Sequence, residues 1–190
     1  MIGLTGSIGM GKSQTAKLFA AEGVPVFDAD AVVHDLYAGE AAAMIAAAFP
    51  GTTRNGVVDR TLLAARVTGD AAALARLESL MHPLVADRRA EFLDQADAPI
   101  VLLDIPLLLE TGAEVDAVVV ATAPDHVQRE RVLSRPGMTA EKFEALKARQ
   151  MSDGQKRAQA HYVVMTDKGL DHASEQVKMI LADIRNKIIA

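Results

Sequence analysis

The sequence predicts a three-layer α/β domain, in which helices cover both faces of a parallel sheet. Short apolar runs without alternating polar residues indicate strands that are buried on both faces. They span residues 1–5, 24–27, 100–103, 117–121 and 162–165. Segments with helical periodicity lie between these runs, and this alternation is typical of parallel strands joined by right-handed crossovers.

The helical segments cover residues 12–22, 71–93, 124–133 and 172–189. The last of them predicts an apolar face toward the core, formed by Val177, Ile180, Leu181, Ile184 and Ile188. Residues 40–49 and 70–80 are also rich in good helix formers. A long, mainly helical stretch separates the second and third strands, which indicates an inserted helical lobe rather than an ordinary crossover.

Composition restricts the class of protein. The 190-residue chain is 50% hydrophobic, carries a formal net charge of −5 and contains no cysteine. An acidic chain without a long Lys/Arg run is a poor general binder of nucleic acid or membrane surfaces. The lack of cysteine excludes disulfides and suits a reducing compartment. No secretory signal or membrane-spanning run is found, so we expect a cytoplasmic protein.

A glycine-rich stretch, GSIGMGKS, lies between the first predicted strand and the first predicted helix. Its spacing satisfies the pattern G-x-x-x-x-G-K-[ST], and its position is the one that a phosphate-binding loop requires. Glycines let backbone N–H groups turn toward phosphates, and the helix N-terminus adds partial positive charge. We therefore expect a nucleoside triphosphate to be bound by Gly9, Met10, Gly11, Lys12, Ser13 and Gln14.

Within this loop, Lys12 is expected to contact the β and γ phosphates and Ser13 to coordinate Mg²⁺ through its hydroxyl. A dinucleotide-binding G-x-G-x-x-G loop is the alternative, but after Gly9 and Gly11 no third glycine follows at the required spacing. A glycine-rich turn with an incidental lysine is the other alternative. The pattern and its context together favour the phosphate-binding loop.

Acidic residues follow the second and third predicted strands, where ligands of open α/β sheets bind. In VFDAD, Asp28 and Asp30 are candidates to orient an acceptor hydroxyl and take its proton. We assign Asp30 as the base and Asp28 as an orienting group or a ligand of Mg²⁺-bound water. Alternatively, one of the two caps the next helix. In IVLLDIPLLLE, Asp104 is either a second magnesium ligand or an ordinary strand-end aspartate.

These motifs together resemble the dephospho-CoA kinases of coenzyme A biosynthesis. The resemblance rests on GSIGMGKS, VFDAD, MHPL, DIPLLLE and QRERVLSR in that order, and extends from Ile2 to the carboxyl-terminal helix. It implies transfer of the γ-phosphoryl group of MgATP to the ribose 3′-hydroxyl of 3′-dephospho-CoA, giving CoA and ADP. We accordingly expect two small-molecule substrates and a monomer or weak homo-oligomer.

The resemblance also implies the fold of nucleoside monophosphate kinases, which belongs to the P-loop NTPases. This fold has a five-stranded parallel sheet in a core of residues 1–30 and 96–190. It adds an acceptor-binding helical lobe at about residues 31–95 and a lid at about residues 131–150.

On the acceptor side, the resemblance implies that His82, Pro106, Leu107 and Glu110 bind the substrate. His82 precedes a proline that is expected to bend the long helix, although a structural histidine fits the sequence equally well. Glu110 either pairs with a cation near the acceptor or caps a helix.

On the lid side, Arg131 and Arg135 lie four residues apart and hence on one helix face. The resemblance implies that Arg135 stabilises the transferring phosphoryl group, against the alternative of a solvated helix face. Arg149 and Gln150 are implied to lie in a helix that borders the nucleotide.

The chain departs from the family pattern at several positions. Met10 and Gln14 differ from the usual residues but remove no phosphate-binding group, and Pro136 replaces an aspartate after the lid arginine. Leu146 stands where an arginine is usual, with Lys147 and Arg149 as nearby substitutes. Thr166 and Asp167 alter the turn on the purine side, and we hypothesise that this change relaxes the selectivity for ATP.

Two other functions compete with this interpretation. A kinase of another small acceptor, such as a nucleoside, would keep the loop and an acid after the second strand but should lack the HP and PLLLE motifs. A noncatalytic nucleotide-dependent switch would need neither an acceptor lobe nor a base, and the presence of Asp28 and Asp30 argues against it.

Overall fold

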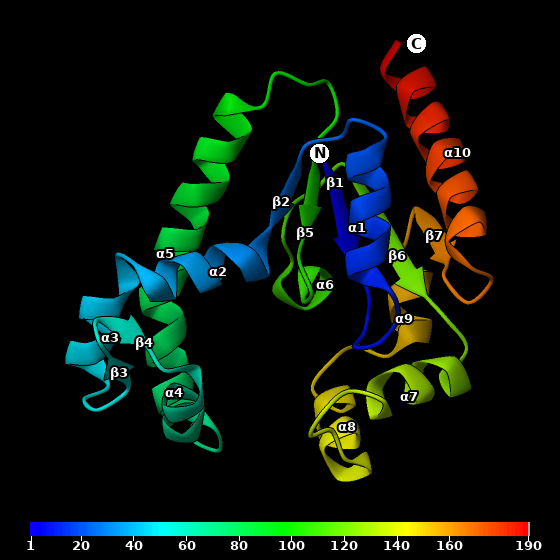
Figure 1. The fold of residues 1–190 in the computed structure, drawn as a ribbon. Helices are drawn as coiled ribbons and strands as arrows, with labels where there is room; N and C mark the ends of the chain where they lie inside the picture. The colour runs from blue at the N-terminus through cyan, green and yellow to red at the C-terminus, as the bar shows by residue number, and fades with distance from the viewer. Residues whose placement is uncertain (190) are drawn as a thin grey trace. The chain divides into compact units, whose positions relative to one another are not determined.

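The computed structural model describes the backbone of residues 1–189 and the side chains of residues 1–188. The chain divides into two compact units (Figure 1). Unit 1 contains residues 1–27 and those from 98 onward, and unit 2 contains residues 28–97. Within the described residues, no helix has both the length and the hydrophobicity needed to cross a membrane.

Unit 1 is built on a parallel sheet whose strand order, among the described residues, is β2-β5-β1-β6-β7. The strands are β1 (Ile2–Thr5), β2 (Val26–Asp28), β5 (Leu102–Asp104), β6 (Ala117–Thr122) and β7 (Tyr162–Met165). The central strand β1 pairs with β5 and β6, which places Leu4 opposite both Asp104 and Val119. Each of the five predicted runs therefore overlaps a strand of this sheet.

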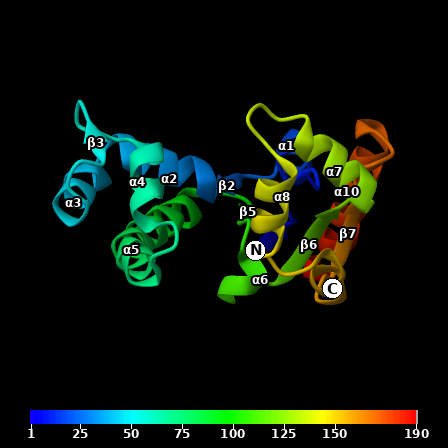
Figure 2. The same ribbon diagram turned by 90° about the horizontal axis from the view of Figure 1, so that it is seen from below.

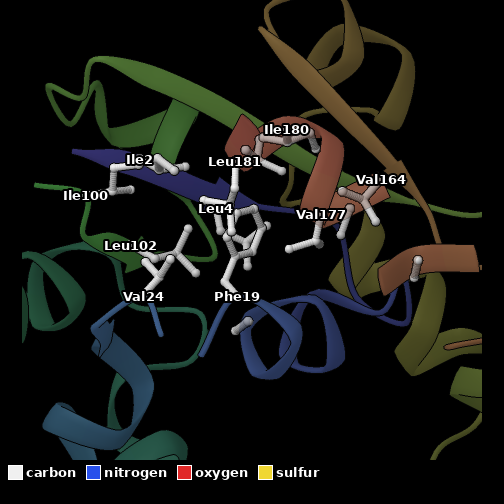
Figure 3. Packing of buried hydrophobic residues seen from close by; sticks show 14 residues of the cluster. Ile2, Leu4, Phe19, Val24, Ile100, Leu102, Val164, Val177, Ile180 and Leu181 are labelled. Carbon is white, nitrogen blue, oxygen red and sulfur yellow. The ribbon is translucent and has the colours of Figure 1, made fainter. Parts of the chain in front are cut away.

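The strands are mainly apolar because both faces of the sheet are covered. On one face, side chains of β1, β5, β6 and β7 pack against Phe19 of α1 (Lys12–Ala21) and Val177 and Leu181 of α10 (Leu170–Ile189), as Figure 3 shows. On the other face, Val118 and Val120 pack against Leu108 of α6 (Leu108–Thr111). Each fully buried side chain of this size stabilises the fold by about 1.5–3 kcal/mol.

The predicted apolar face of the last helix is confirmed except at its end. Val177, Ile180 and Leu181 are buried, and Ile184 packs partly against the same core. Ile188, however, is 56% exposed. Among the residues whose side chains are described, the core cluster extends along α10 as far as Ile184.

The chain between β6 and β7 forms three helices, α7 (Asp125–Leu133), α8 (Ala140–Lys147) and α9 (Asp153–Ala158). Figure 2 shows α7 and α8, and Figure 1 shows α9. Pro136 and Gly137, the latter with φ of 72°, separate α7 from α8. The Ser152 side chain and Gln155 form a capping box that starts α9. Because α8 has already ended at Lys147, the chain between α8 and α9 is a turn.

Unit 2 has its own helical core. It consists of α2 (Ala29–Ala38), α3 (Ala41–Ala48), α4 (Arg60–Val67), α5 (Ala71–Gln95) and the hairpin of β3 (Thr53–Arg54) with β4 (Val57–Val58). Its buried cluster includes Leu36, Ile45, Phe49, Leu63, Leu77 and Met81. The helix α5 continues through Pro83, so the proline removes one backbone hydrogen bond without ending the helix.

Candidate active site

The glycine-rich loop connects β1 to α1, as predicted. Gly11 directly precedes α1 and has φ of 90°, a left-handed conformation that glycine adopts without strain. A Cβ atom at Gly11 would also lie 2.8 Å from Oγ1 and 2.9 Å from Cβ of Thr166. Glycine is therefore required here both for the backbone conformation and for the close approach of the turn after β7.

The buried side chain of Met10 and its hydrogen bonds fix this loop to the rest of unit 1. Its side chain is 1% exposed, and its sulfur accepts a hydrogen bond from the Ala123 N–H at 3.2 Å. The Thr166 hydroxyl donates to the Met10 carbonyl at 2.9 Å and accepts from the Arg131 guanidinium at 2.9 Å. A second Arg131 nitrogen donates to the Thr166 carbonyl at 2.7 Å. The Met10 side chain therefore packs inside the protein rather than facing solvent.

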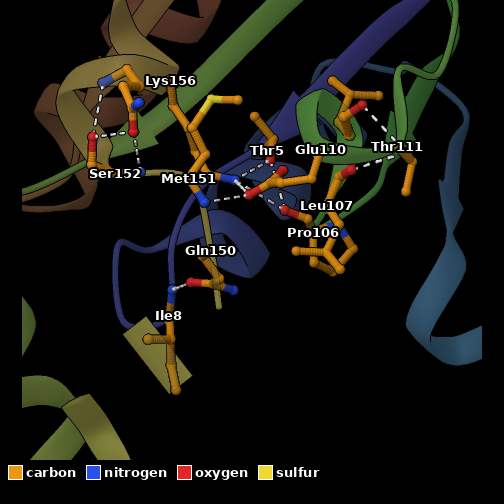
Figure 4. Close-up of polar contacts among 12 residues, drawn as sticks. Thr5, Ile8, Pro106, Leu107, Glu110, Thr111, Gln150, Met151, Ser152 and Lys156 are labelled. Atoms are coloured by element: carbon orange, nitrogen blue, oxygen red, sulfur yellow. Dashed lines mark hydrogen bonds and ion pairs between the residues drawn. The ribbon is translucent and has the colours of Figure 1, made fainter. Parts of the chain in front are cut away.

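Two glutamines hold the backbone of Ile8 in the same loop. The Gln128 side chain, fully buried in α7, donates to the Ile8 carbonyl at 2.8 Å. The Gln150 side chain accepts from the Ile8 N–H at 3.1 Å (Figure 4). Sequence reasoning gave Gln150 a place near the nucleotide but missed Gln128, because a glutamine in a polar helix carries no signal of burial.

The Lys12 ammonium forms an ion pair with Oδ1 of Asp104 at 2.7 Å. Asp104 ends β5 and is 2% exposed, whereas Lys12 is 14% exposed at the start of α1. The register that places Leu4 opposite Asp104 brings the end of β5 beside the start of the loop. The structure therefore brings together two of the predicted site residues, and Ser13 follows them as an exposed side chain of α1.

The donor set around Lys12 determines which metal ion suits this site. In the described part of the chain, no three His, Asp or Glu side chains gather into a metal-binding group. A hydroxyl from Ser13 and a carboxylate from Asp104 suit Mg²⁺, which usually keeps several waters and takes one or two protein ligands together with phosphate oxygens.

The segment after β5 is fixed by polar contacts rather than by packing alone (Figure 4). The Thr5 hydroxyl donates to the Pro106 carbonyl at 2.9 Å, while Leu107 is 41% exposed. Glu110, on α6, forms an ion pair with Lys156 at 2.8 Å and accepts from the Met151 N–H at 2.9 Å. Glu110 pairs with a cation, Lys156, and Leu107 rather than Glu110 occupies the cap position of α6. That this ion pair lies near the acceptor stays a prediction.

These contacts influence the ionisation of Glu110. Partial burial acts to raise the pKa of its carboxyl, but hydrogen bonds from Lys156 and from the Met151 backbone act against it. The net effect is a pKa below the ordinary value. Glu110 is therefore held as a carboxylate at neutral pH.

Lys156 is the partner that the sequence did not indicate. It lies in α9, within DGQKRA, where a lysine is expected to face solvent. In the structure it is fully buried.

In unit 2, Asp28 is the N-cap of α2, and its Oδ1 accepts from the Ala31 N–H at 3.0 Å. Asp30 lies in the first turn of the same helix with an exposed side chain. The capping role considered for one of the two aspartates thus belongs to Asp28. His82 lies on α5, directly before Pro83, and is exposed.

Two expectations about the arginines were wrong. Arg149 and Gln150 lie in the turn between α8 and α9, because the capping box at Ser152 starts a separate helix. Arg135 lies beyond the end of α7 rather than on its face with Arg131, since a residue before proline is disfavoured in helical conformation. Arg135 and Arg149 are both exposed, whereas the Arg131 guanidinium is bound to Thr166.

Comparison with known proteins adds to this geometry. A family model described as dephospho-CoA kinase matches residues 1–172. A dephospho-CoA kinase from Nitrobacter winogradskyi is 56% identical over 187 residues, which cover 96% of this chain and 94% of that protein.

Solved structures show the same fold. The crystal structure of TT1252 from Thermus thermophilus matches with a TM-score of 0.86 and 34% identity, and 96% of each chain is covered. A dephospho-CoA kinase from Campylobacter jejuni has the same fold, with a TM-score of 0.65, 20% identity and 96% coverage of each chain.

Proposed function

The chain belongs to the dephospho-CoA kinase family, and from this premise we propose how its residues carry out ATP-dependent phosphoryl transfer. The reaction is transfer of the ATP γ-phosphoryl group to the ribose 3′-hydroxyl of 3′-dephospho-CoA, giving CoA and ADP. The observation that most directly supports it is the Lys12 ammonium, held 2.7 Å from Asp104 at the end of a glycine loop. A lysine in this position is suited to phosphates rather than to an uncharged ligand.

The glycine loop binds the triphosphate. The N–H groups of Met10 and Gln14 donate to the Ser7 and Gly11 carbonyls, so the backbone donors proposed to face the phosphates are those of Gly9, Gly11, Lys12 and Ser13. The N-terminus of α1 adds partial positive charge. Lys12 contacts the β and γ phosphates, where negative charge increases during transfer. When bound, Mg²⁺ neutralises phosphate charge, and Ser13 and Asp104 are the residues that would hold it.

The acceptor hydroxyl is activated by Asp30. Both carboxylates are exposed, but Asp28 uses one oxygen to cap α2, so Asp30 in the first turn is assigned as the base. A carboxylate that accepts the hydroxyl proton as the new P–O bond forms provides general-base catalysis. Asp28 then acts by fixing the start of α2 and with it the position of Asp30.

Unit 2 is the proposed acceptor lobe. Within unit 1, the residues proposed to contact the acceptor are Pro106, Leu107 and Glu110. His82 contributes a hydrogen-bonding side chain from α5, and Leu107 contributes exposed apolar surface. Residues 131–150 form the lid, where Arg135 binds the transferring phosphoryl group and Arg149 the nucleotide. Closure of such a lid excludes water, which would otherwise compete with the acceptor.

A coupled assay of ADP release tests this function. With MgATP, the enzyme is expected to release ADP in the presence of 3′-dephospho-CoA, and mass spectrometry should identify CoA as the product. Adenosine, AMP and buffer alone serve as the comparison acceptors. Equal release with adenosine, or slow release that no acceptor stimulates, would contradict the proposed substrate while leaving the nucleotide site intact.

A further inference from the structure

We propose that Lys156 is a positioning residue that fixes the acceptor-side segment, residues 106–110, to the strand that leads into the phosphate loop. This inference rests on the proposed function, because it assigns to that segment a role in placing the acceptor. It concerns a fully buried residue whose polar contacts include Thr5, Pro106 and Glu110.

The Lys156 ammonium lies among three polar groups from separate parts of unit 1 (Figure 4). It is 2.8 Å from Oε1 of Glu110 on α6. It also donates at 3.4 Å to the Thr5 hydroxyl at the end of β1 and at 3.4 Å to the Pro106 carbonyl. The ammonium therefore links α9 with β1 and with both ends of the acceptor-side segment.

The burial of this charge is costly and calls for an explanation. The Lys156 side chain is 0% exposed, so its ammonium has exchanged water for these three protein oxygens. A buried ion pair often stabilises a fold less than apolar side chains of similar volume. A methionine would fill the same space without a charge, so packing alone does not account for a lysine here.

The contacts define what the lysine holds in place. Thr5 directly precedes Gly6, the first glycine of the phosphate loop, and Pro106 directly precedes the exposed Leu107. The Pro106 carbonyl accepts hydrogen bonds from both Thr5 and Lys156. The surface offered by Leu107 is thereby held at a fixed distance from the loop that binds the phosphates.

Glu110 extends the same link to the segment after the lid. Its Oε1 atom is bound by Lys156 and by the Met151 N–H, and Met151 follows Gln150, which holds Ile8 of the loop. Loss of the ammonium leaves the Glu110 carboxylate without its charged partner. We then expect residues 106–110 to shift, which misplaces the acceptor relative to the phosphoryl group. A misplacement of about 1 Å lowers the rate of the chemical step by about 100-fold.

The test compares Lys156→Met with Arg157→Met, a matched control on the same helix. Arg157 is 52% exposed and pairs with Asp153, so this control removes the same charge from α9 without touching the buried link. For Lys156→Met, we expect kcat/KM for 3′-dephospho-CoA to fall by about 100-fold while the Kd for ATP stays within about threefold of the wild-type value. For Arg157→Met, both parameters should match those of the wild type.

Two further variants keep Lys156 and therefore test the proposal even if Lys156→Met does not fold. Glu110→Gln and Thr5→Val each remove one partner of the ammonium, and both should raise the KM for the acceptor more than the KM for ATP. In the Lys156→Met/Glu110→Gln double variant, the losses should not add, since both act through one contact. Circular dichroism establishes that each variant is folded at the assay temperature.

Several results would overturn the inference. A folded Lys156→Met enzyme with wild-type kcat/KM for the acceptor would do so, as would equal losses toward both substrates, which would indicate a general structural role. Wild-type acceptor parameters in both partner variants would do so as well. If the wild-type enzyme does not phosphorylate 3′-dephospho-CoA at all, both the proposed function and this inference are wrong. If the wild type is active and Lys156→Met retains its acceptor kinetics, only this inference is wrong.

Discussion

The ammonium of Lys12 and the carboxylate of Asp104 neutralise one another across 2.7 Å at the ends of α1 and β5. Because Asp104 is 2% exposed, solvent contributes little to stabilising its charge, and Lys12 is a cation that does so. Phosphate oxygens that approach Lys12 compete with Asp104 for the same ammonium. A second cation beside Asp104 would relieve that competition, which is consistent with the proposed role of Asp104 as a ligand of Mg²⁺.

Replacing Lys12 should therefore affect both catalysis and stability. We expect Lys12→Ala to lower turnover by orders of magnitude, because the charge on the β and γ phosphates is no longer neutralised. The variant should also lose about 3 kcal/mol of unfolding free energy, since Asp104 remains buried without its cation. ADP release and urea denaturation measure the two effects. Lys17→Ala, an exposed lysine on the same helix, should change neither.

The two aspartates at the start of α2 should behave differently when they are altered. Asp30→Asn is expected to lower kcat by about 10²- to 10⁴-fold with ATP binding intact, because it removes the proton acceptor. Asp28→Ala should instead cost about 1 kcal/mol of stability through loss of the N-cap. Steady-state kinetics and denaturation distinguish these outcomes, with the exposed Asp35→Asn on α2 as the control. Full activity of Asp30→Asn would transfer the role of base to Asp28 or remove it.

Gly11 and Gly23 provide a matched pair for testing the loop. Both have positive φ, 90° and 80°, but a Cβ at Gly11 would meet Thr166 at 2.8 Å, whereas at Gly23 nothing lies within 4 Å. Gly23→Ala should therefore show only the cost of the backbone conformation, about 1–2 kcal/mol. Gly11→Ala should in addition displace the loop and abolish measurable ATP binding in calorimetry. Equal ATP affinity of the two variants would contradict this explanation.

The contribution of Glu110 to stability should depend on pH. Partial burial raises the pKa of its carboxyl, but the hydrogen bonds from Lys156 and Met151 lower it below the ordinary 4.5. This stabilisation is complete above the ordinary value and is lost as the pH falls through the lower folded pKa. The difference in unfolding free energy between the wild type and Glu110→Gln should hence shrink below about pH 4.5. Denaturant titrations from neutral to acidic pH check this, and a constant difference would contradict it.

The turn formed by Thr166 and Asp167 is expected to reduce the selectivity for ATP over GTP. The Thr166 hydroxyl is occupied by Met10 and Arg131, which leaves Asp167 as the altered group of the turn. We expect the ratio of kcat/KM for ATP to that for GTP to be lower than in a family member with an asparagine-containing turn. One hydrogen bond, about 1.4 kcal/mol, corresponds to about tenfold. Asp167→Asn should raise the ratio, and an unchanged, high preference for ATP in the wild type would disprove the hypothesis.

The sheet could be predicted from the sequence because each of its strands is a short apolar run buried on both faces. The phosphate-loop candidate was equally visible, since its residues lie next to one another in the chain. The Asn55-Gly56 turn of the β3–β4 hairpin was missed, although both residues have positive φ and this dipeptide is a strong hairpin signal. The capping box at Ser152 likewise gave a readable signal that α8 and α9 are separate.

Lys156 and Gln128 could not be found in this way. Each is a polar residue of a polar helix, and its burial depends on elements that are distant in the chain. Lys156 contacts Thr5 across 151 positions, and Gln128 contacts Ile8 across 120. Local periodicity and composition contain no information about such contacts, so they become visible only once the sheet is assembled.

The chain leaves the sheet after β2, forms unit 2 and returns to the sheet in β5. The strands β2 and β5 are neighbours in the sheet. The Pro25 carbonyl accepts from the Leu102 N–H at 2.9 Å, which joins the chain on either side of the insertion. An insertion whose ends meet on adjacent strands can be exchanged without changing the order of the sheet. On the proposed assignment of unit 2 as the acceptor lobe, exchanging residues 28–97 would alter recognition of the acceptor while the sheet that carries the phosphate loop is retained.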